Sequence, residues 1–124
     1  MTKLEILRAN NNSDITNANH MIKLKELRTC GSSCGINDKG IINLTKLETL
    51  YANNNSIITN VNHMTKLKTS SASYFCAIND NGISNIADLE ILYANSNTKI
   101  ININHMTKLR ELQAYGLSCG INDK

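Results

Sequence analysis

The sequence predicts an α/β solenoid, a right-handed superhelix of six short coils with a parallel β-sheet on its concave face and 3₁₀ or short helical turns on its convex face. Three observations predict it: a leucine anchor recurs every 20–23 residues, two kinds of unit alternate, and the residues after each anchor alternate as in a strand. Each anchor follows Lys or Asp; the anchors are Leu4, Leu24, Leu47, Leu67, Leu89 and Leu109. A unit this short cannot bury its own apolar face, so the units must stack.

The two unit types form pairs of 42–43 residues, and three pairs nearly fill the 124 residues. The first type reads TKLEILRANNNSDITNANHM, TKLETLYANNNSIITNVNHM and ADLEILYANSNTKIININHM. The second reads IKLKELRTCGSSCGINDKGIINL, TKLKTSSASYFCAINDNGISNI and TKLRELQAYGLSCGINDK. We therefore expect a single domain over 1–124, with the last coil incomplete. The coils are expected to start near Thr2, Ile22, Thr45, Thr65, Ala87 and Thr107.

The units resemble leucine-rich repeats, whose core pattern is LxxLxLxxN, or C in place of N. In the first unit type the pattern falls on Leu4, Leu7, Ala9 and Asn12, and it recurs in the two later copies. The second type departs from the pattern, because one or two extra residues precede its Cys. Its tail, INDKGI or INDNGI, resembles a segment of cysteine-containing leucine-rich repeats. The Asn-rich, alternating style also resembles repeat proteins of giant amoeba-infecting viruses.

The resemblance implies a structural ladder where each coil leaves its strand. In the family, the Asn points inward and bonds turn backbone groups that would otherwise be buried and unpaired. The ladder positions are Asn12, Asn55 and Asn97 in one unit type and Cys34, Cys76 and Cys119 in the other. Strand alternation places Leu7 and Ala9 inward, and Ser70 is the one polar residue in the Leu7 column, so we expect a weak point there.

Further positions recur on the expected convex side. Asp38, Asp80 and Asp123 suit the N-cap of a short helical turn. One His per pair, always in NHM, is expected to fix the convex turn rather than to bind zinc, because the copies lie two coils apart.

A charge ladder follows the anchors. Signs alternate without exception in the column Glu5, Lys25, Glu48, Lys68, Glu90 and Arg110. Parallel strands lie ~4.8 Å apart, so opposite charges become neighbours, and a slip of one unit would oppose like charges. The net charge of +3 is therefore too weak and too evenly spread to favour nucleic acid.

Composition excludes several classes of protein. Leu and Ile supply 29 residues, enough for an aliphatic core. The 20 Asn, 16 Ile and 10 Lys indicate an AT-rich genome. No apolar run is long enough for a membrane helix and no signal peptide is recognisable. We expect an intracellular protein with reduced cysteines, in the host cytoplasm if the gene is viral.

No residue pattern indicates an enzyme. The Ser, His and Asp residues recur as repeat positions, and neither a nucleophile elbow nor a glycine-rich phosphate loop is present. Cys30 and Cys34 have no second Cys pair nearby, so we expect neither a metal nor a cofactor. Cys30 lies in an outward column and is a candidate exposed thiol.

The concave face is the usual binding surface of such solenoids, which predicts a non-catalytic scaffold for protein–protein interaction. Its candidate residues are Arg8, Arg28, Tyr51, Tyr93, Gln113 and Tyr115. The alternative interpretation is that these are ordinary residues of the sheet face with no role in binding. A rival function is a structural protein that stacks head-to-tail into oligomers or filaments, because Glu5 and Arg110 would continue the charge ladder across a junction. A fragment of a longer repeat array is also compatible with the sequence.

Overall fold

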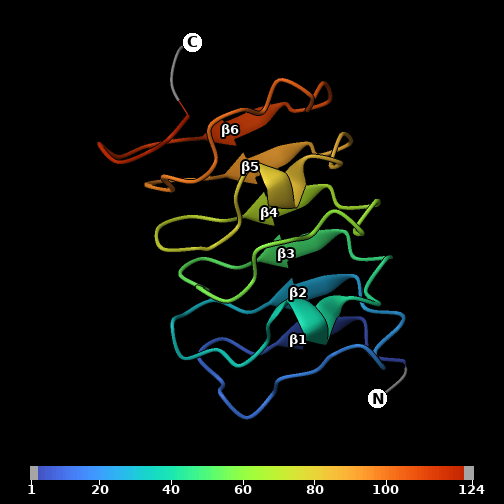
Figure 1. Ribbon diagram of the computed structural model, residues 1–124. Coiled ribbons are helices and arrows are strands. Elements are labelled where there is room, and N and C mark those ends of the chain that lie inside the picture. Colours follow the sequence, from blue (N-terminus) through green and yellow to red (C-terminus); the bar gives the residue numbers. More distant parts are fainter. Residues whose placement is uncertain (1–2, 122–124) are drawn as a thin grey trace.

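The computed structural model describes residues 3–121 and confirms the predicted solenoid with a parallel sheet (Figure 1). The six strands pair in sequence order, each parallel to the next, and the same strand position recurs in register from coil to coil. They are β1 (Ile6–Arg8), β2 (Glu26–Arg28), β3 (Thr49–Tyr51), β4 (Thr69–Ser71), β5 (Ile91–Tyr93) and β6 (Glu111–Gln113). The six strands form a single stack from β1 to β6.

Short 3₁₀ helices occur in the second unit type, as predicted: η1 (Asp38–Ile41) and η2 (Asn81–Ile83). Each packs tightly on the arc of the coil before it. A Cβ added at Gly40 would collide with the carbonyl oxygen of Thr16, and one at Gly82 with that of Thr59. Glycine is therefore required at these two helix positions because the neighbouring backbone is too close for a side chain.

The predicted N-cap role is wrong for Asp38, and Asp80 holds the cap position of η2 without a side-chain cap hydrogen bond. The cap of η1 is Asn37, whose backbone is extended and whose Oδ1 accepts the Gly40 amide at 3.1 Å. Asn79 accepts the Gly82 amide in the same way at 2.9 Å. A side-chain cap comes from the extended residue before the turn, whereas Asp80 already has helical backbone angles. Asp123 lies outside the described residues.

The two aspartates instead link η1 and η2 to the following coil. Asp38 Oδ1 accepts the amide of Thr59 at 2.8 Å. Asp80 Oδ1 accepts the amide of Ile101 at 2.7 Å. The His rings link the same elements. His63 Nε2 lies 2.8 Å from the Ile41 carbonyl oxygen, and His105 Nε2 lies 2.9 Å from the Ile83 carbonyl oxygen. The predicted turn-fixing role of histidine is confirmed at these two positions.

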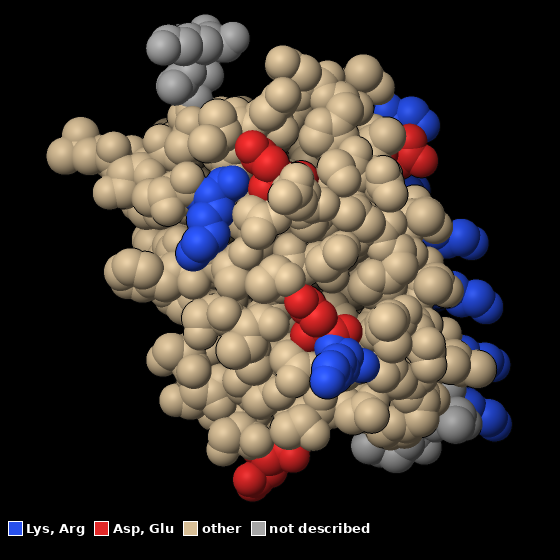
Figure 2. Space-filling model, viewed as in Figure 1, with Lys and Arg blue, Asp and Glu red and all other residues tan. Residues whose placement is uncertain are grey.

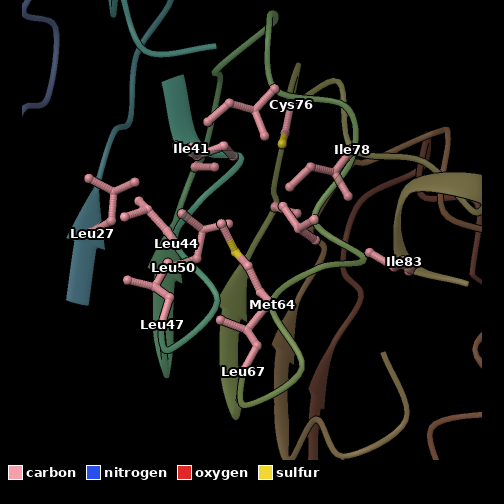
Figure 3. Packing of buried hydrophobic residues seen from close by; sticks show 14 of the residues in the cluster. Leu27, Ile41, Leu44, Leu47, Leu50, Met64, Leu67, Cys76, Ile78 and Ile83 are labelled. Atoms are coloured by element: carbon pink, nitrogen blue, oxygen red, sulfur yellow. The ribbon is translucent and has the colours of Figure 1, made fainter. Parts of the chain in front are cut away.

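The core is a continuous aliphatic column inside the coils (Figure 3). Leucines at the middle strand position, such as Leu27 and Leu50, are fully buried. Ser70 takes that position in β4, between Leu50 and Leu92 in register, and is also buried. Its small side chain supplies less apolar contact than the leucines on either side.

The ladder residues of the first unit type bond the coil before them as well as their own turn. Asn55 is fully buried; its Nδ2 donates to the Thr29 carbonyl at 3.0 Å and the Ile36 carbonyl at 3.3 Å. Its Oδ1 accepts the amides of Ile57 at 3.0 Å and Ile58 at 3.1 Å. One amide side chain thus satisfies four backbone groups in two coils, three of them in buried hydrogen bonds.

The other ladder positions repeat this arrangement in part. Asn97 donates to the carbonyls of Ala72 and Ile78 and accepts the amides of Lys99 and Ile100. Asn12, in the first coil, is exposed and accepts two amides of its own turn.

Cysteine reaches the preceding coil through sulfur. Cys34 donates to the Ala9 carbonyl and Cys119 to the Ala94 carbonyl, each at 3.3 Å. Cys76, at the third position of this kind, is buried.

We predict that Asn55→Ala lowers the free energy of unfolding by about 3–5 kcal/mol, because four backbone groups, three of them buried, lose their partner. The matched control is Asn12→Ala, at the same unit position but exposed, with an expected loss of about 1 kcal/mol. Urea unfolding followed by circular dichroism measures both variants. Equal losses would contradict the bridging role of Asn55.

Candidate functional site

The outward face of the sheet carries most of the predicted binding residues in a single column. The last residue of each strand faces outward, and the register places these residues side by side. In order, they are Arg8, Arg28, Tyr51, Ser71, Tyr93 and Gln113. Tyr115 is not part of this column; it lies beyond the end of β6 and is strongly exposed.

Arg28 and Tyr51 contact each other directly within this column. The Arg28 guanidinium carbon lies 4.6 Å from the centre of the Tyr51 ring, a cation–π contact. Glu26, on the same strand, accepts from Arg28 Nε at 2.6 Å. This hydrogen bond raises the pKa of Arg28 above its ordinary value. Glu26 therefore holds a charged guanidinium over an aromatic ring, and both residues remain partly exposed to solvent.

Tyr93 is held from the other side. Its hydroxyl donates to Glu111 Oε1 on β6 at 3.2 Å. The pKa of Tyr93 is raised above its ordinary value. Desolvation is the largest cause, and the hydrogen bond to Glu111 is the second. Between Tyr51 and Tyr93 lies Ser71, which is buried although it sits on the outward face. The column therefore has one tyrosine on each side of a small residue.

A second outward column has a structural role that the sequence did not reveal. Asn10 Oδ1 accepts the Cys30 amide, Asn53 Oδ1 that of Ser73 and Asn95 Oδ1 that of Tyr115, each at 2.8 Å. Each side chain takes the place of a backbone carbonyl beyond the end of its strand.

Burial raises the pKa of the Cys30 thiol, which makes it less nucleophilic at neutral pH than an ordinary cysteine.

The alternating charge column forms ion pairs at two junctions. Lys25 Nζ lies 3.9 Å from Glu5 Oε1, and Arg110 Nε lies 3.3 Å from Glu90 Oε1. These side chains are mostly exposed apart from Glu90. Exposed pairs of this kind contribute only ~0.2–1 kcal/mol each, so they add little to overall stability, and the role of this column in setting register stays a prediction.

A column of lysines was not among the features predicted from the sequence. One residue before each anchor leucine, at the edge where the strands begin, the chain carries Lys3, Lys23, Lys46, Lys66, Asp88 and Lys108. Figure 2 shows basic side chains one above another along that edge of the molecule. The charge is thus less evenly spread than the alternating column suggests, and the Lys–Leu repeat was the signal that pointed to it.

An exposed aromatic pair was missed as well. Each coil leaves its strand through one residue with positive φ, and this is Gly31 in β2's coil and Gly116 in β6's coil. In the coil of β4 it is Tyr74, with φ 64°, a conformation that costs energy for a bulky side chain. Phe75, the next residue, is 82% exposed. The sequence signal was the replacement of glycine by Tyr-Phe in the second unit pair, where the first and third pairs have Gly31 and Gly116.

No family model matches this chain, and no curated protein matches it. Among residues 3–121, no three His, Cys, Asp or Glu side chains are grouped as ligands of a metal ion. None of the helices within that range has the length and apolar character needed to span a membrane.

The Cys76 thiol makes stability depend on pH. Burial raises its pKa from 9.0 to about 11, so folding favours the neutral thiol. Its contribution is complete below about pH 9 and is lost as the pH rises toward 11, because the unfolded chain ionises first. Between about pH 8 and 11 we expect the parent to lose about 2–3 kcal/mol more of its free energy of unfolding than Cys76→Ala loses. Urea titrations across this range measure it, and identical slopes would contradict it.

Proposed function

We propose that this chain is a non-catalytic, leucine-rich-repeat type scaffold that binds a protein through the outward face of its sheet. The single observation that carries the proposal is the Arg28–Tyr51 pair, 4.6 Å from guanidinium to ring centre and held by Glu26. Tyrosine and arginine dominate the binding energy of protein interfaces. Here their side chains are restrained before any partner arrives, which reduces the entropy lost on binding.

The rest of the outward column supports the same proposal. Tyr93 is restrained by Glu111 at 3.2 Å, so a second aromatic side chain is positioned two strands from Tyr51. Arg8 and Gln113 extend the column to the first and last strands and supply polar contacts. An aromatic centre with polar ends is the usual composition of a protein interface.

The sheet-face proposal predicts that Tyr51→Ala with Tyr93→Ala weakens partner binding by at least about tenfold, because two anchors are lost. The partner is first recovered by affinity capture with the full chain and then titrated by calorimetry. The matched control is Ile22→Ala with Ile42→Ala, two side chains that are also exposed, at 57% and 60%, but lie away from the strands. A partner lost with the isoleucine variant and kept with the tyrosine variant would refute the sheet-face site.

The second candidate function is head-to-tail self-assembly. Leu112 on β6 is 41% exposed, whereas Leu92, at the same position on β5, is 1% exposed. A second copy whose β1 paired with β6 would cover Leu112 and place Glu5 beside Arg110. That contact does not close on itself, so it would build oligomers or filaments.

Self-assembly is tested by exchanging the two charges. We predict that Glu5→Lys or Arg110→Glu alone lowers the weight-average mass measured by light scattering over a concentration series. The double variant should restore it, because opposite charges again face each other at the junction. A parent chain that stays monomeric at high concentration, with a mass unchanged by either substitution, rules out the assembly.

A further inference from the structure

The lysine column is a surface whose chemistry the fold does not require. The pairing of β1 to β4 is in register, so Lys3, Lys23, Lys46 and Lys66 hold the same position on four successive coils. All four side chains are exposed. With strands ~4.8 Å apart, like charges follow one another along the edge, an arrangement that repels and lowers stability.

Glu5 and Glu48 lie among these lysines and offset part of the repulsion, but within residues 3–121 none of the four lysines forms an ion pair. At the far end of the edge, Asp88 interrupts the run and pairs with Lys108 at 3.2 Å. The edge as a whole, including the alternating charge column, has eight basic and four acidic side chains, whereas the entire chain has a net charge of +3. The rest of the chain is therefore slightly negative, and the positive charge belongs to this edge.

The basic side chains surround a hollow of about 300 Å³. It is lined by Glu5, Lys23, Lys25, Lys46, Glu48 and Lys66, from four successive coils. The lining contains no aromatic residue, so it offers no platform on which bases could stack. Two carboxylates interrupt the lysines at regular steps.

We propose that this lysine edge binds an acidic, extended protein segment that runs along the stack. Carboxylates of the segment would pair with Lys23, Lys46 and Lys66, and its neutral or basic residues would face Glu5 and Glu48. A nucleic-acid backbone is negative at every unit and cannot avoid the two carboxylates, whereas a peptide can. This inference does not depend on the sheet-face site, because it uses none of the residues of that column.

The probe is a fluorescein-labelled peptide of about twelve residues that alternates Glu and Ser, titrated with the full chain by fluorescence anisotropy at about 20 mM salt, where electrostatic contacts are least screened. The test variant is Lys23→Glu with Lys46→Glu. The matched control is Lys39→Glu with Lys99→Glu, which changes the net charge equally at two exposed lysines away from the edge. Lys23→Gln with Lys46→Gln removes the charge without adding carboxylates, and circular dichroism checks the fold of each variant.

The expected result is a loss of at least about tenfold with the edge variant, an intermediate loss with the Gln variant and less than about threefold with the control. Equal losses in the edge variant and the control would mean that only the overall charge matters, which overturns the proposal. An unlabelled oligothymidylate with the same number of charges is the competitor. Displacement of the peptide by a lower concentration of oligothymidylate than of unlabelled peptide would also overturn it, because the edge would then favour phosphate.

Discussion

The structure depends on a single kind of interaction: an asparagine side chain that stands in for backbone where a coil leaves its strand. Each strand has only three residues, so the regular sheet satisfies few backbone groups and the turns leave many unpaired. Asn55 and Asn97 close this gap on the inside, each with bonds to its own turn and to the coil before. Asn53 and Asn95 do so on the outside. Without these bridges, stacking would bury unsatisfied peptide groups, each of which carries a desolvation cost.

The same solution extends around the arcs, where an amide side chain joins the first two first-type arcs to η1 and η2. Asn19 donates to the Lys39 carbonyl at 2.7 Å and accepts the Asn43 amide at 2.9 Å. Asn62 repeats both bonds with Asn81 and Asn85. Asp38 then carries the connection from η1 to the following coil. Polar links therefore run along the stack in parallel with the aliphatic core, and they give the abundant asparagine a structural purpose beyond any bias of the genome.

Much of the fold was predictable because its determinants are local and repeated. The anchor spacing and the strand alternation fixed the order, direction and register of all six strands. The N-caps were not predicted correctly, since Asn37 and Asp38 both suit that role and only the backbone angles decide between them. The roles of Asn10 and Tyr74 also could not be predicted from the sequence. The role of Asn10 depends on an amide in the next coil, and that of Tyr74 depends on a turn conformation. On the candidate site, residue types indicated Arg28 and Tyr51, but the stacking and the support from Glu26 are tertiary facts.

The two-coil period separates what the fold demands from what it permits. Structural positions differ between the unit types: asparagine alternates with cysteine in the ladder, both 3₁₀ helices found within residues 3–121 lie in the second type, and signs alternate in the charge column. In the first four coils, the lysine before the anchor leucine does not follow this alternation. Lys3 and Lys46 belong to one unit type, and Lys23 and Lys66 belong to the other. A position that both types share in spite of their different turns, at a cost in like-charge repulsion, is not explained by the requirements of either coil. Complementary charge on a binding partner would explain it, since the partner would remove the repulsion that the free protein retains.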